Sequence, residues 1–122
     1  MNQSKKTLVV GASEKPYRYA NKAIRRLVLF GHEVVPLAPR PGQVEGISFV
    51  TGTPRLKGIH TITLYVGPDR QSGLYDYLLS LNPKRIIFNP GTENIAFIKK
   101  ARKQGIETIE NCTLVMLETG TF

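Results

Sequence analysis

The chain has 122 residues and a formal net charge of +8, with 41% hydrophobic and 21% charged residues. This length predicts a single domain over residues 1–122, and the composition excludes a disordered chain. One cysteine, Cys112, excludes an internal disulfide framework. No apolar stretch approaches the ~20 residues that span a bilayer, and the first residues lack a signal-peptide core, so we expect a cytoplasmic protein with no membrane partner.

The positive charge favours an anionic partner, but it is spread along the chain in small groups such as Lys5-Lys6 and Lys99-Lys100. Groups of this kind are typical of solvated surfaces. Because no basic stretch is interleaved with aromatic residues, we expect a small phosphate-bearing nucleotide cofactor rather than nucleic acid. The sequence leaves a protein partner or a homo-oligomer open.

Apolar, β-branched runs alternate with runs that have helical spacing. Strands are predicted at residues 7–10, 32–37, 59–66, 85–88 and 106–109, and residues 49–50 could add a short one. Helices are predicted at 20–30, 68–81 and 93–103, the last capped by Thr92, with a final helical turn at 114–117. This alternation predicts an α/β fold, a Rossmann-like three-layer αβα domain with a five-stranded parallel sheet in the order 3-2-1-4-5.

In such a fold the carboxyl ends of the parallel strands gather at one edge of the sheet. The segments that follow the five strands are residues 11–13, 38–40, 67–70, 89–91 and 110–112, all rich in small, turn-forming or polar residues. Any single loop after a strand can have this composition, so their convergence carries more weight than any one of them. We expect the binding site at this edge.

The segment after the first strand is the most informative. Small side chains at Gly11 and Ala12 would let the bare main-chain amides of this bend meet a phosphate, and Ser13 could donate its hydroxyl. The N-terminus of the next helix would add unpaired N–H groups. The run is not the G-x-G-x-x-G dinucleotide motif, and Lys15 and Arg18 could either bind a diphosphate or point into solvent.

The segment after the second strand helps to distinguish cofactors. A NAD site places a carboxylate there to accept hydrogen bonds from ribose hydroxyls, whereas this strand ends in Leu37-Ala38-Pro39-Arg40. Arg40 suits a ribose phosphate, which NADP or coenzyme A would supply, although it could instead cap an exposed turn.

The chain offers little for catalysis. His32 and His60 lie at strand starts, the opposite edge of the sheet, and Cys112 has no histidine predicted near it. No metal-ligand or Walker A pattern occurs, so we predict no catalytic residue and no metal site. The residues favour a non-catalytic binding module, and the alternative is an NADP-dependent oxidoreductase or an acyl-CoA-transforming enzyme subunit.

A characteristic order links four segments: V-V-G-A-S at 9–13, G-H-E-V-V-P-L-A-P at 31–39, F-N-P-G-T at 88–92 and E-N-C-T-L-V-M-L at 110–117. In these segments the chain resembles the small stand-alone CoA-binding domain proteins, which are related to the nucleotide-binding domain of succinyl-CoA synthetase α subunits. The resemblance covers about residues 6–117. It implies a Rossmann-like domain that holds coenzyme A across the carboxyl edge of the sheet.

The resemblance also implies roles by motif position. The residues implied to meet the phosphates are Gly11, Ala12 and Ser13. Those implied beside the adenosine part are Pro39 and Arg40, and those implied beneath the nucleotide are Val66 and Pro68. The residues implied to line the pantetheine side are Asn89, Pro90 and Gly91, with Asn111 and Cys112 at the floor.

The sequence departs from the commoner pattern at residues 89–93, where many relatives carry a glutamine-containing segment. It also has no counterpart near Asn89 of the catalytic histidine of succinyl-CoA synthetases, so the resemblance does not carry phosphoryl transfer over to this chain. The partner ligase domains have no counterpart either. What the resemblance leaves is a binding or regulatory role toward coenzyme A or an acyl-CoA.

Overall fold

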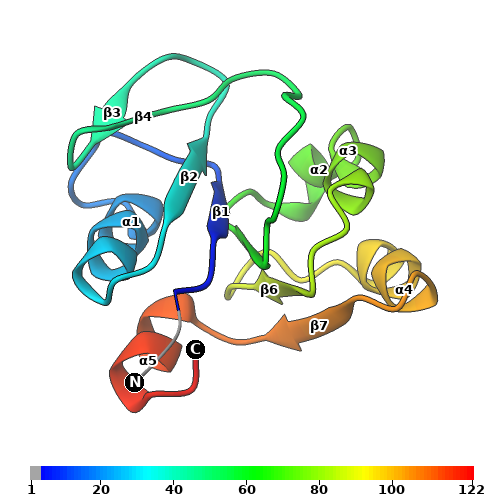
Figure 1. Ribbon diagram of the computed structural model, residues 1–122. Coiled ribbons are helices and arrows are strands. Elements are labelled where there is room, and N and C mark those ends of the chain that lie inside the picture. The colour runs from blue at the N-terminus through cyan, green and yellow to red at the C-terminus, as the bar shows by residue number, and fades with distance from the viewer. Residues whose placement is uncertain (1–3) are drawn as a thin grey trace.

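A parallel sheet of five strands forms the middle layer of the computed structural model, which describes residues 4–122 (Figure 1). The strands are β1 (Thr7–Val10), β2 (Val34–Leu37), β5 (Thr61–Leu64), β6 (Arg85–Phe88) and β7 (Glu107–Glu110). Every neighbouring pair is parallel. β1, β5 and β6 are buried along their whole length, as strands covered on both faces should be. The predicted Rossmann-like α/β sheet is confirmed.

The strands lie in the order β2-β1-β5-β6-β7. Numbered within this sheet alone the order is 2-1-3-4-5, so β5 lies beside β1 rather than beyond β2. On the free side of β2, Val50 forms an isolated parallel bridge with Leu37. When Val50 is counted as the third strand in chain order, the sheet has the order 3-2-1-4-5-6. This is the predicted order 3-2-1-4-5 with β7 added at the end. Pairing does not extend past this bridge because Gly52 has a positive φ of 72° and Pro54 cannot donate a main-chain hydrogen bond.

A small antiparallel hairpin precedes this bridge and was not predicted from the sequence. It consists of β3 (Gln43–Val44) and β4 (Ile47–Ser48). The turn residues Glu45 and Gly46 both have positive φ, 54° and 74°, as a two-residue hairpin turn requires. Asparagine or aspartate usually precedes the glycine in such turns, so a glutamate gives no signal that sequence reasoning could use.

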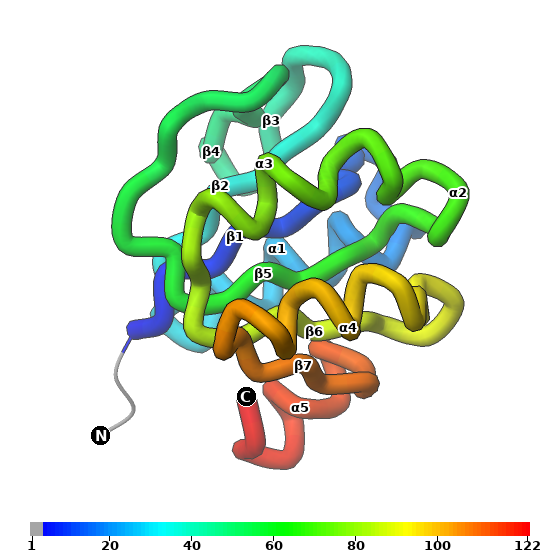
Figure 2. Tube along the Cα trace, turned by 90° about the vertical axis from the view of Figure 1, so that its right-hand side faces the viewer, coloured from blue at the N-terminus to red at the C-terminus, as the bar shows by residue number. Residues whose placement is uncertain are grey.

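Helices cover both faces of the sheet (Figures 1 and 2). They are α1 (Tyr19–Leu29), α2 (Pro68–Gln71), α3 (Tyr75–Ser80), α4 (Ile95–Lys103) and α5 (Thr113–Thr119). On one face, Val9 belongs to a buried cluster with Ile24 of α1 and Leu117 of α5. On the other, Leu8 belongs to a second cluster with Phe97 of α4. No helix within residues 4–122 has the length and apolar character that crossing a bilayer requires.

Two helix predictions need correction. The helix expected at 68–81 is divided into α2 and α3, and Gly73, a poor helix former, lies in the break. The helix expected from residue 93 begins at Ile95, because Asn94 is its cap and accepts a hydrogen bond from the Phe97 N–H at 3.2 Å. Thr92, the expected cap, instead donates its hydroxyl to the Asn89 main-chain oxygen at 2.8 Å.

The chain reverses its direction of travel in the sheet between β1 and β5. It passes from β1 through α1 to β2 on one side, and then returns to β5 on the other side of β1. Loops leave the carboxyl ends of such a strand pair in opposite directions, and a crevice opens between them. The fold therefore places the site beyond Val10 of β1 and Leu64 of β5.

Candidate functional site

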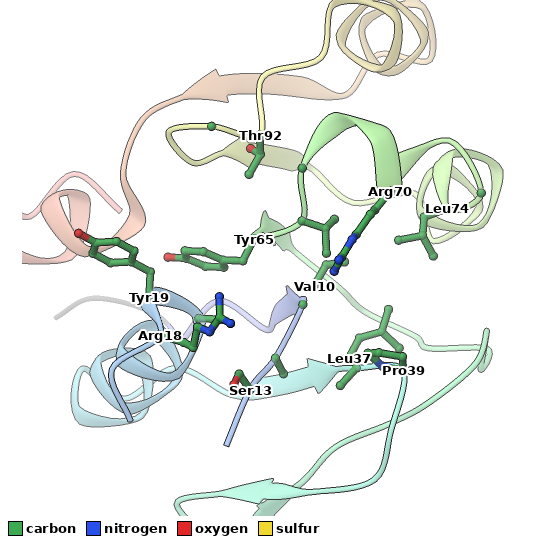
Figure 3. A pocket seen from close by; sticks show the side chains of 18 of the residues that line it. Val10, Ser13, Arg18, Tyr19, Leu37, Pro39, Tyr65, Arg70, Leu74 and Thr92 are labelled. Atoms are coloured by element: carbon green, nitrogen blue, oxygen red, sulfur yellow. The ribbon is translucent and has the colours of Figure 1, made fainter. Parts of the chain in front are cut away.

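A cleft of about 920 Å³ lies at this crevice, along the carboxyl edge of the sheet (Figure 3). The segments after β1, β2, β5 and β6 all contribute to it, so four of the five expected loops converge. The loop after β7 does not line the cleft. The predicted site residues that do line it are Gly11, Ala12, Ser13, Arg18, Pro39, Val66, Pro90 and Gly91.

The other predicted site residues lie around the cleft without lining it. Arg40 is exposed directly after Pro39, and Pro68 is the exposed first residue of α2. Asn111 and Cys112 precede α5, where the Asn111 Oδ1 accepts a hydrogen bond from the Cys112 N–H at 2.7 Å. These positions follow the expected loops, but their side chains do not form the surface of the cleft.

Asn89 is buried and has a supporting role. Its exposed fraction is 3%, and its Nδ2 donates to the Thr63 hydroxyl at 2.7 Å and to the Leu64 main-chain oxygen at 2.8 Å. Its Oδ1 accepts from the Thr113 N–H at 2.8 Å. The amide therefore joins β5, β6 and the start of α5, and both of its ends are already paired beneath the cleft.

Gly11 serves close packing and does not supply a free amide. Its φ is 94°, and a Cβ there would lie 3.0 Å from Val66 Cγ1 and 3.1 Å from the Tyr65 main-chain oxygen. The N–H groups of Gly11 and Ala12 both donate to the Leu37 main-chain oxygen at 3.0 Å. The expectation that these two amides are bare for a phosphate is therefore wrong, because β2 lies close enough to accept from both.

Ser13 is the first residue of this loop with a hydrogen-bond donor that remains free for a ligand. Its Oγ accepts a hydrogen bond from the Lys15 N–H at 3.1 Å, which leaves the hydroxyl hydrogen available to a ligand. The main-chain oxygen of Ser13 accepts from Asn21 Nδ2 at 2.9 Å, and Asn21 Oδ1 accepts from Arg25 Nε at 2.8 Å. Two side chains of α1 thus fix the conformation of the loop that presents Ser13.

The N-terminus of α1 points into the same region. Arg18 is its cap residue but makes no side-chain capping bond, and no acidic residue occupies the first turn. The Arg18 N–H donates to the Lys15 main-chain oxygen at 3.1 Å, whereas the N–H groups of Tyr19, Ala20 and Asn21 have no partner within residues 4–122. Tyr19 and Ala20, the first two residues of the helix, line the cleft.

The charge of the cleft is positive. Lys15, Arg18 and Arg70 line it, and no aspartate or glutamate of residues 4–122 does. Figure 3 shows Arg18 and Arg70 directed into the cleft from the start of α1 and from α2. Arg70 was not singled out from the sequence, because its orientation depends on the single turn of α2.

Tyr65 contributes a buried phenol at the edge of the cleft. Its hydroxyl is buried and has no hydrogen-bond partner in the described part of the chain. Burial raises the pKa of Tyr65 to about 12, against a smaller opposite effect of the neighbouring Thr113 hydroxyl. The phenol is therefore neutral at pH 7, and its buried oxygen does not form part of the cleft surface.

Gln71 links two sides of the cleft and was also missed. It is fully buried, and its Nε2 donates to the Val66 main-chain oxygen at 2.9 Å and to the Thr92 main-chain oxygen at 2.8 Å. Val66 follows β5 and Thr92 follows β6, so one amide fixes the separation of these loops. A glutamine in a predicted helix gives no sequence signal for such a link.

The cleft lacks an acid–base pair and a metal site. His32 and His60 precede β2 and β5, at the opposite edge of the sheet, as predicted. Across residues 4–122 no group of three histidine, cysteine or acidic side chains could hold a metal ion. The arrangement can bind an anionic ligand through N–H, hydroxyl and cationic groups.

The profile of the family described as CoA binding domain matches residues 5–118. The chain belongs to the CoA binding domain family. A comparison with curated proteins finds no match.

Solved structures of other proteins show a similar fold. An uncharacterized protein of known crystal structure is 46% identical, with a TM-score of 0.97 over 99% of this chain and 100% of that one. A hypothetical protein from Pyrococcus horikoshii OT3 is 27% identical, with a TM-score of 0.86 over 96% and 84% of the two chains. The dinucleotide-forming acetyl-coenzyme A synthetase 1 of Ca. Korarchaeum cryptofilum, in complex with phosphate and ADP, is 19% identical, with a TM-score of 0.72 over 88% of this chain and 25% of that one. This last likeness concerns the fold alone.

Proposed function

We propose that the protein binds coenzyme A or an acyl-CoA and acts as a binding or regulatory domain rather than as a catalyst. The observation that carries the proposal is the charge of the cleft, where three cations and an uncapped helix N-terminus face a surface without carboxylates. A cleft of this kind suits a ligand with a diphosphate. Membership of the CoA binding domain family favours coenzyme A among such ligands.

The diphosphate would be held in the middle of the cleft. Ser13 would donate its free hydroxyl, and the first N–H groups of α1 would donate from the same side. Arg18 and Arg70 would neutralise the phosphate charge from opposite sides (Figure 3). Gly11 would contribute indirectly, because its lack of a side chain lets the segments after β1 and β5 approach each other.

The two organic parts of the ligand would lie on either side of the phosphates. The adenosine would lie toward Pro39, at the end of β2, where the cleft surface is uncharged. The pantetheine arm would lie toward Pro90 and Gly91 after β6. Asn89 would support this end from below through its three hydrogen bonds.

Four predicted contacts that do not line the cleft have flanking positions in this proposal. Arg40 would flank the adenosine, Pro68 would lie beneath the nucleotide as the first residue of α2, and Asn111 and Cys112 would flank the pantetheine end. We also propose a cytoplasmic location, in keeping with a ligand of this kind.

The choice against NAD follows from the end of β2. No carboxylate stands there to accept hydrogen bonds from ribose hydroxyls, since the strand is followed by Ala38 and Pro39. NADP would satisfy the charge of the cleft as well, so it is the cofactor against which coenzyme A must be compared. A reductase would also need a proton donor for the carbonyl oxygen of its substrate, and the Tyr65 phenol, whose pKa is about 12, has a buried hydroxyl.

Ligand-dependent thermal stability tests the proposal. A ligand that binds only the folded state raises the unfolding temperature by mass action. We expect coenzyme A to raise the unfolding temperature of the purified chain more than NADPH, NAD or a short DNA duplex at equal concentration and 150 mM salt. Equal shifts with all four ligands, lost at higher salt, would contradict the proposal because they would indicate unspecific charge attraction.

A further inference from the structure

A second pocket of about 510 Å³ adjoins the cleft at Thr53, which lines both. It lies between residues 53–57, the segment that leads into β5, and the C-terminal end of α3, where Tyr77, Ser80 and Leu81 line it. We call this pocket the α3 groove. A ligand seated in the cleft near Thr53 would have the α3 groove directly beside it.

The α3 groove is positively charged and its cations are free. Arg55 and Lys57 line it, both exposed, and no acidic residue in the described part of the chain does. Neither side chain takes part in the salt bridges of residues 4–122, which are Lys6 with Glu33 and Arg26 with Glu118.

Two hydroxyl groups of the groove already donate to the protein. Tyr77 Oη donates to the Pro54 main-chain oxygen at 2.6 Å, and Ser80 Oγ donates to the Tyr77 main-chain oxygen at 2.5 Å. The donors that the side chains of the α3 groove offer to a ligand are therefore the Thr53 hydroxyl and the two cations, and the cations suit an anion.

The backbone that carries these cations is held in place. The Tyr77–Pro54 hydrogen bond fixes one end of the segment to α3, and Leu56 packs against the buried core. Lys6 Nζ donates to the Lys57 main-chain oxygen at 2.8 Å and fixes the other end beside β1. Less conformational freedom is then lost when Arg55 binds a ligand, because only its side chain must become ordered.

The end of the cleft that meets the groove is uncharged. Leu37, Pro39, Gly52 and Leu74 line the cleft there, together with Thr53, whereas Arg18 and Arg70 lie nearer its centre (Figure 3). Apolar surface suits a nucleobase, and the diphosphate belongs with the arginines. This arrangement places the adenosine ribose close to Thr53.

We infer that the α3 groove is a subsite for a phosphomonoester on the adenosine ribose, bound by Arg55 with Lys57 in support. The inference rests on the proposed function and makes it narrower: the preferred ligands carry a ribose phosphate, as coenzyme A does and dephospho-CoA, ADP and NAD do not. Arg40, which the sequence suggests for this phosphate, lines neither the cleft nor the groove.

Calorimetric titration of the full chain with coenzyme A and with dephospho-CoA tests the inference. We expect the wild type to bind coenzyme A about tenfold more tightly, since a charged hydrogen bond contributes roughly that factor. Arg55→Gln should remove most of this preference and leave the dissociation constant of dephospho-CoA unchanged. Lys57→Gln should reduce the preference by a smaller factor. Lys99→Gln, an exposed position on α4 outside both pockets, is the matched control for loss of one positive charge.

The outcomes separate the subsite from the proposed function. If both ligands bind but Arg55→Gln retains the full preference, the subsite is wrong and the proposed function stands. Loss of the preference in Arg40→Gln alone would likewise place the phosphate at the loop after β2 and overturn the subsite. If the wild type binds neither ligand, the proposed function fails and the subsite fails with it. Titration with NADP and with NAD provides a second pair of ligands, which shows whether Arg55 and Lys57 also bind a phosphate on the ribose 2′-oxygen.

Discussion

Gly11 lies against Val66 so closely that a Cβ at Gly11 would be 3.0 Å from the Val66 Cγ1. The loops after β1 and β5 can therefore touch because residue 11 has no side chain. This contact lies at the point where the chain reverses its direction in the sheet. The Gly11 N–H is fixed to Leu37 of β2 as well. This junction of three strands determines where Ser13 and the start of α1 can meet a ligand.

Gly11→Ala should destabilise the protein and weaken coenzyme A binding. The φ of 94° strains any residue with a Cβ, at about 1–3 kcal/mol, and the contact with Val66 adds a steric cost. Gly105→Ala is the matched control, because Gly105 has a φ of 84° but nothing within 4 Å of a Cβ. Urea unfolding and calorimetry should show a larger loss for Gly11→Ala and a binding defect in that variant alone; equal losses in both measurements would contradict the account.

Arg18→Gln and Arg70→Gln should each weaken coenzyme A binding by about tenfold, as expected for loss of one charge-assisted contact to phosphate. Neither arginine forms a salt bridge within residues 4–122, so the urea midpoint should not change. The salt dependence of the dissociation constant should also become less steep in both variants. An unchanged dissociation constant in both would place the diphosphate elsewhere.

Gln71→Glu should destabilise the fold by about 3 kcal/mol at pH 8, because a buried carboxylate would face the two carbonyls that Gln71 now joins. Burial should raise the pKa of the introduced carboxyl, so the loss should shrink as the pH falls and the group becomes protonated. Gln104→Glu, which breaks one partly exposed bond to the Leu79 main-chain oxygen, should cost only about 1 kcal/mol. Urea midpoints at pH 8 and pH 5 measure both, and equal losses would refute the role of Gln71 as a link between loops.

The two histidines should make the fold sensitive to mild acid. Burial lowers the pKa of His32 and of His60 below 6.5, and the neighbouring Lys5 and Arg85 charges lower both further, while Glu107 opposes the shift at His60. Below pH 6.5 the unfolded chain then binds more protons than the folded one, so stability is complete above this pH and is lost as the pH falls.

Chemical unfolding at pH 7.5 and pH 5.5 measures this effect. The double variant His32→Asn/His60→Asn keeps a side-chain acceptor for the Lys5 N–H, which now donates to His32 Nδ1 at 3.0 Å. It should lose most of the difference in urea midpoint between the two pH values. A difference as large as that of the wild type would assign the acid sensitivity to other groups.

Much of the sheet could be predicted from the sequence because buried parallel strands are encoded locally. The run Thr7–Val10 and the run Arg85–Phe88 have the bounds that their apolar residues predict. The α3 groove could not be predicted, since it depends on Thr53 and Tyr77 coming together from distant parts of the chain. The break between α2 and α3 was missed because the apolar residues at 74–81 have helical spacing and Pro68 suits a helix start, so one helix was predicted to run through Gly73.

The location of the site could be predicted from the sequence, but the side chains that line it could be predicted only in part. Convergence of loops after β1, β2, β5 and β6 follows from parallel topology alone, and it brings Ser13, Pro39 and Pro90 to one cleft. Side-chain direction does not follow from topology. Asn89 looked like a ligand contact and is instead buried among Thr63, Leu64 and Thr113. Arg70 belongs to the expected segment 67–70 but was not singled out, although it lines the cleft.

Amide NMR during titration with coenzyme A locates the bound ligand on the protein. We expect the largest shifts at the N–H groups of Ser13, Tyr19, Ala20 and Arg70, with smaller ones at Gly91 after β6. Shifts concentrated on the basic face of α4, at Lys99 and Lys103, with Ser13 and Ala20 unchanged, would contradict binding in the cleft.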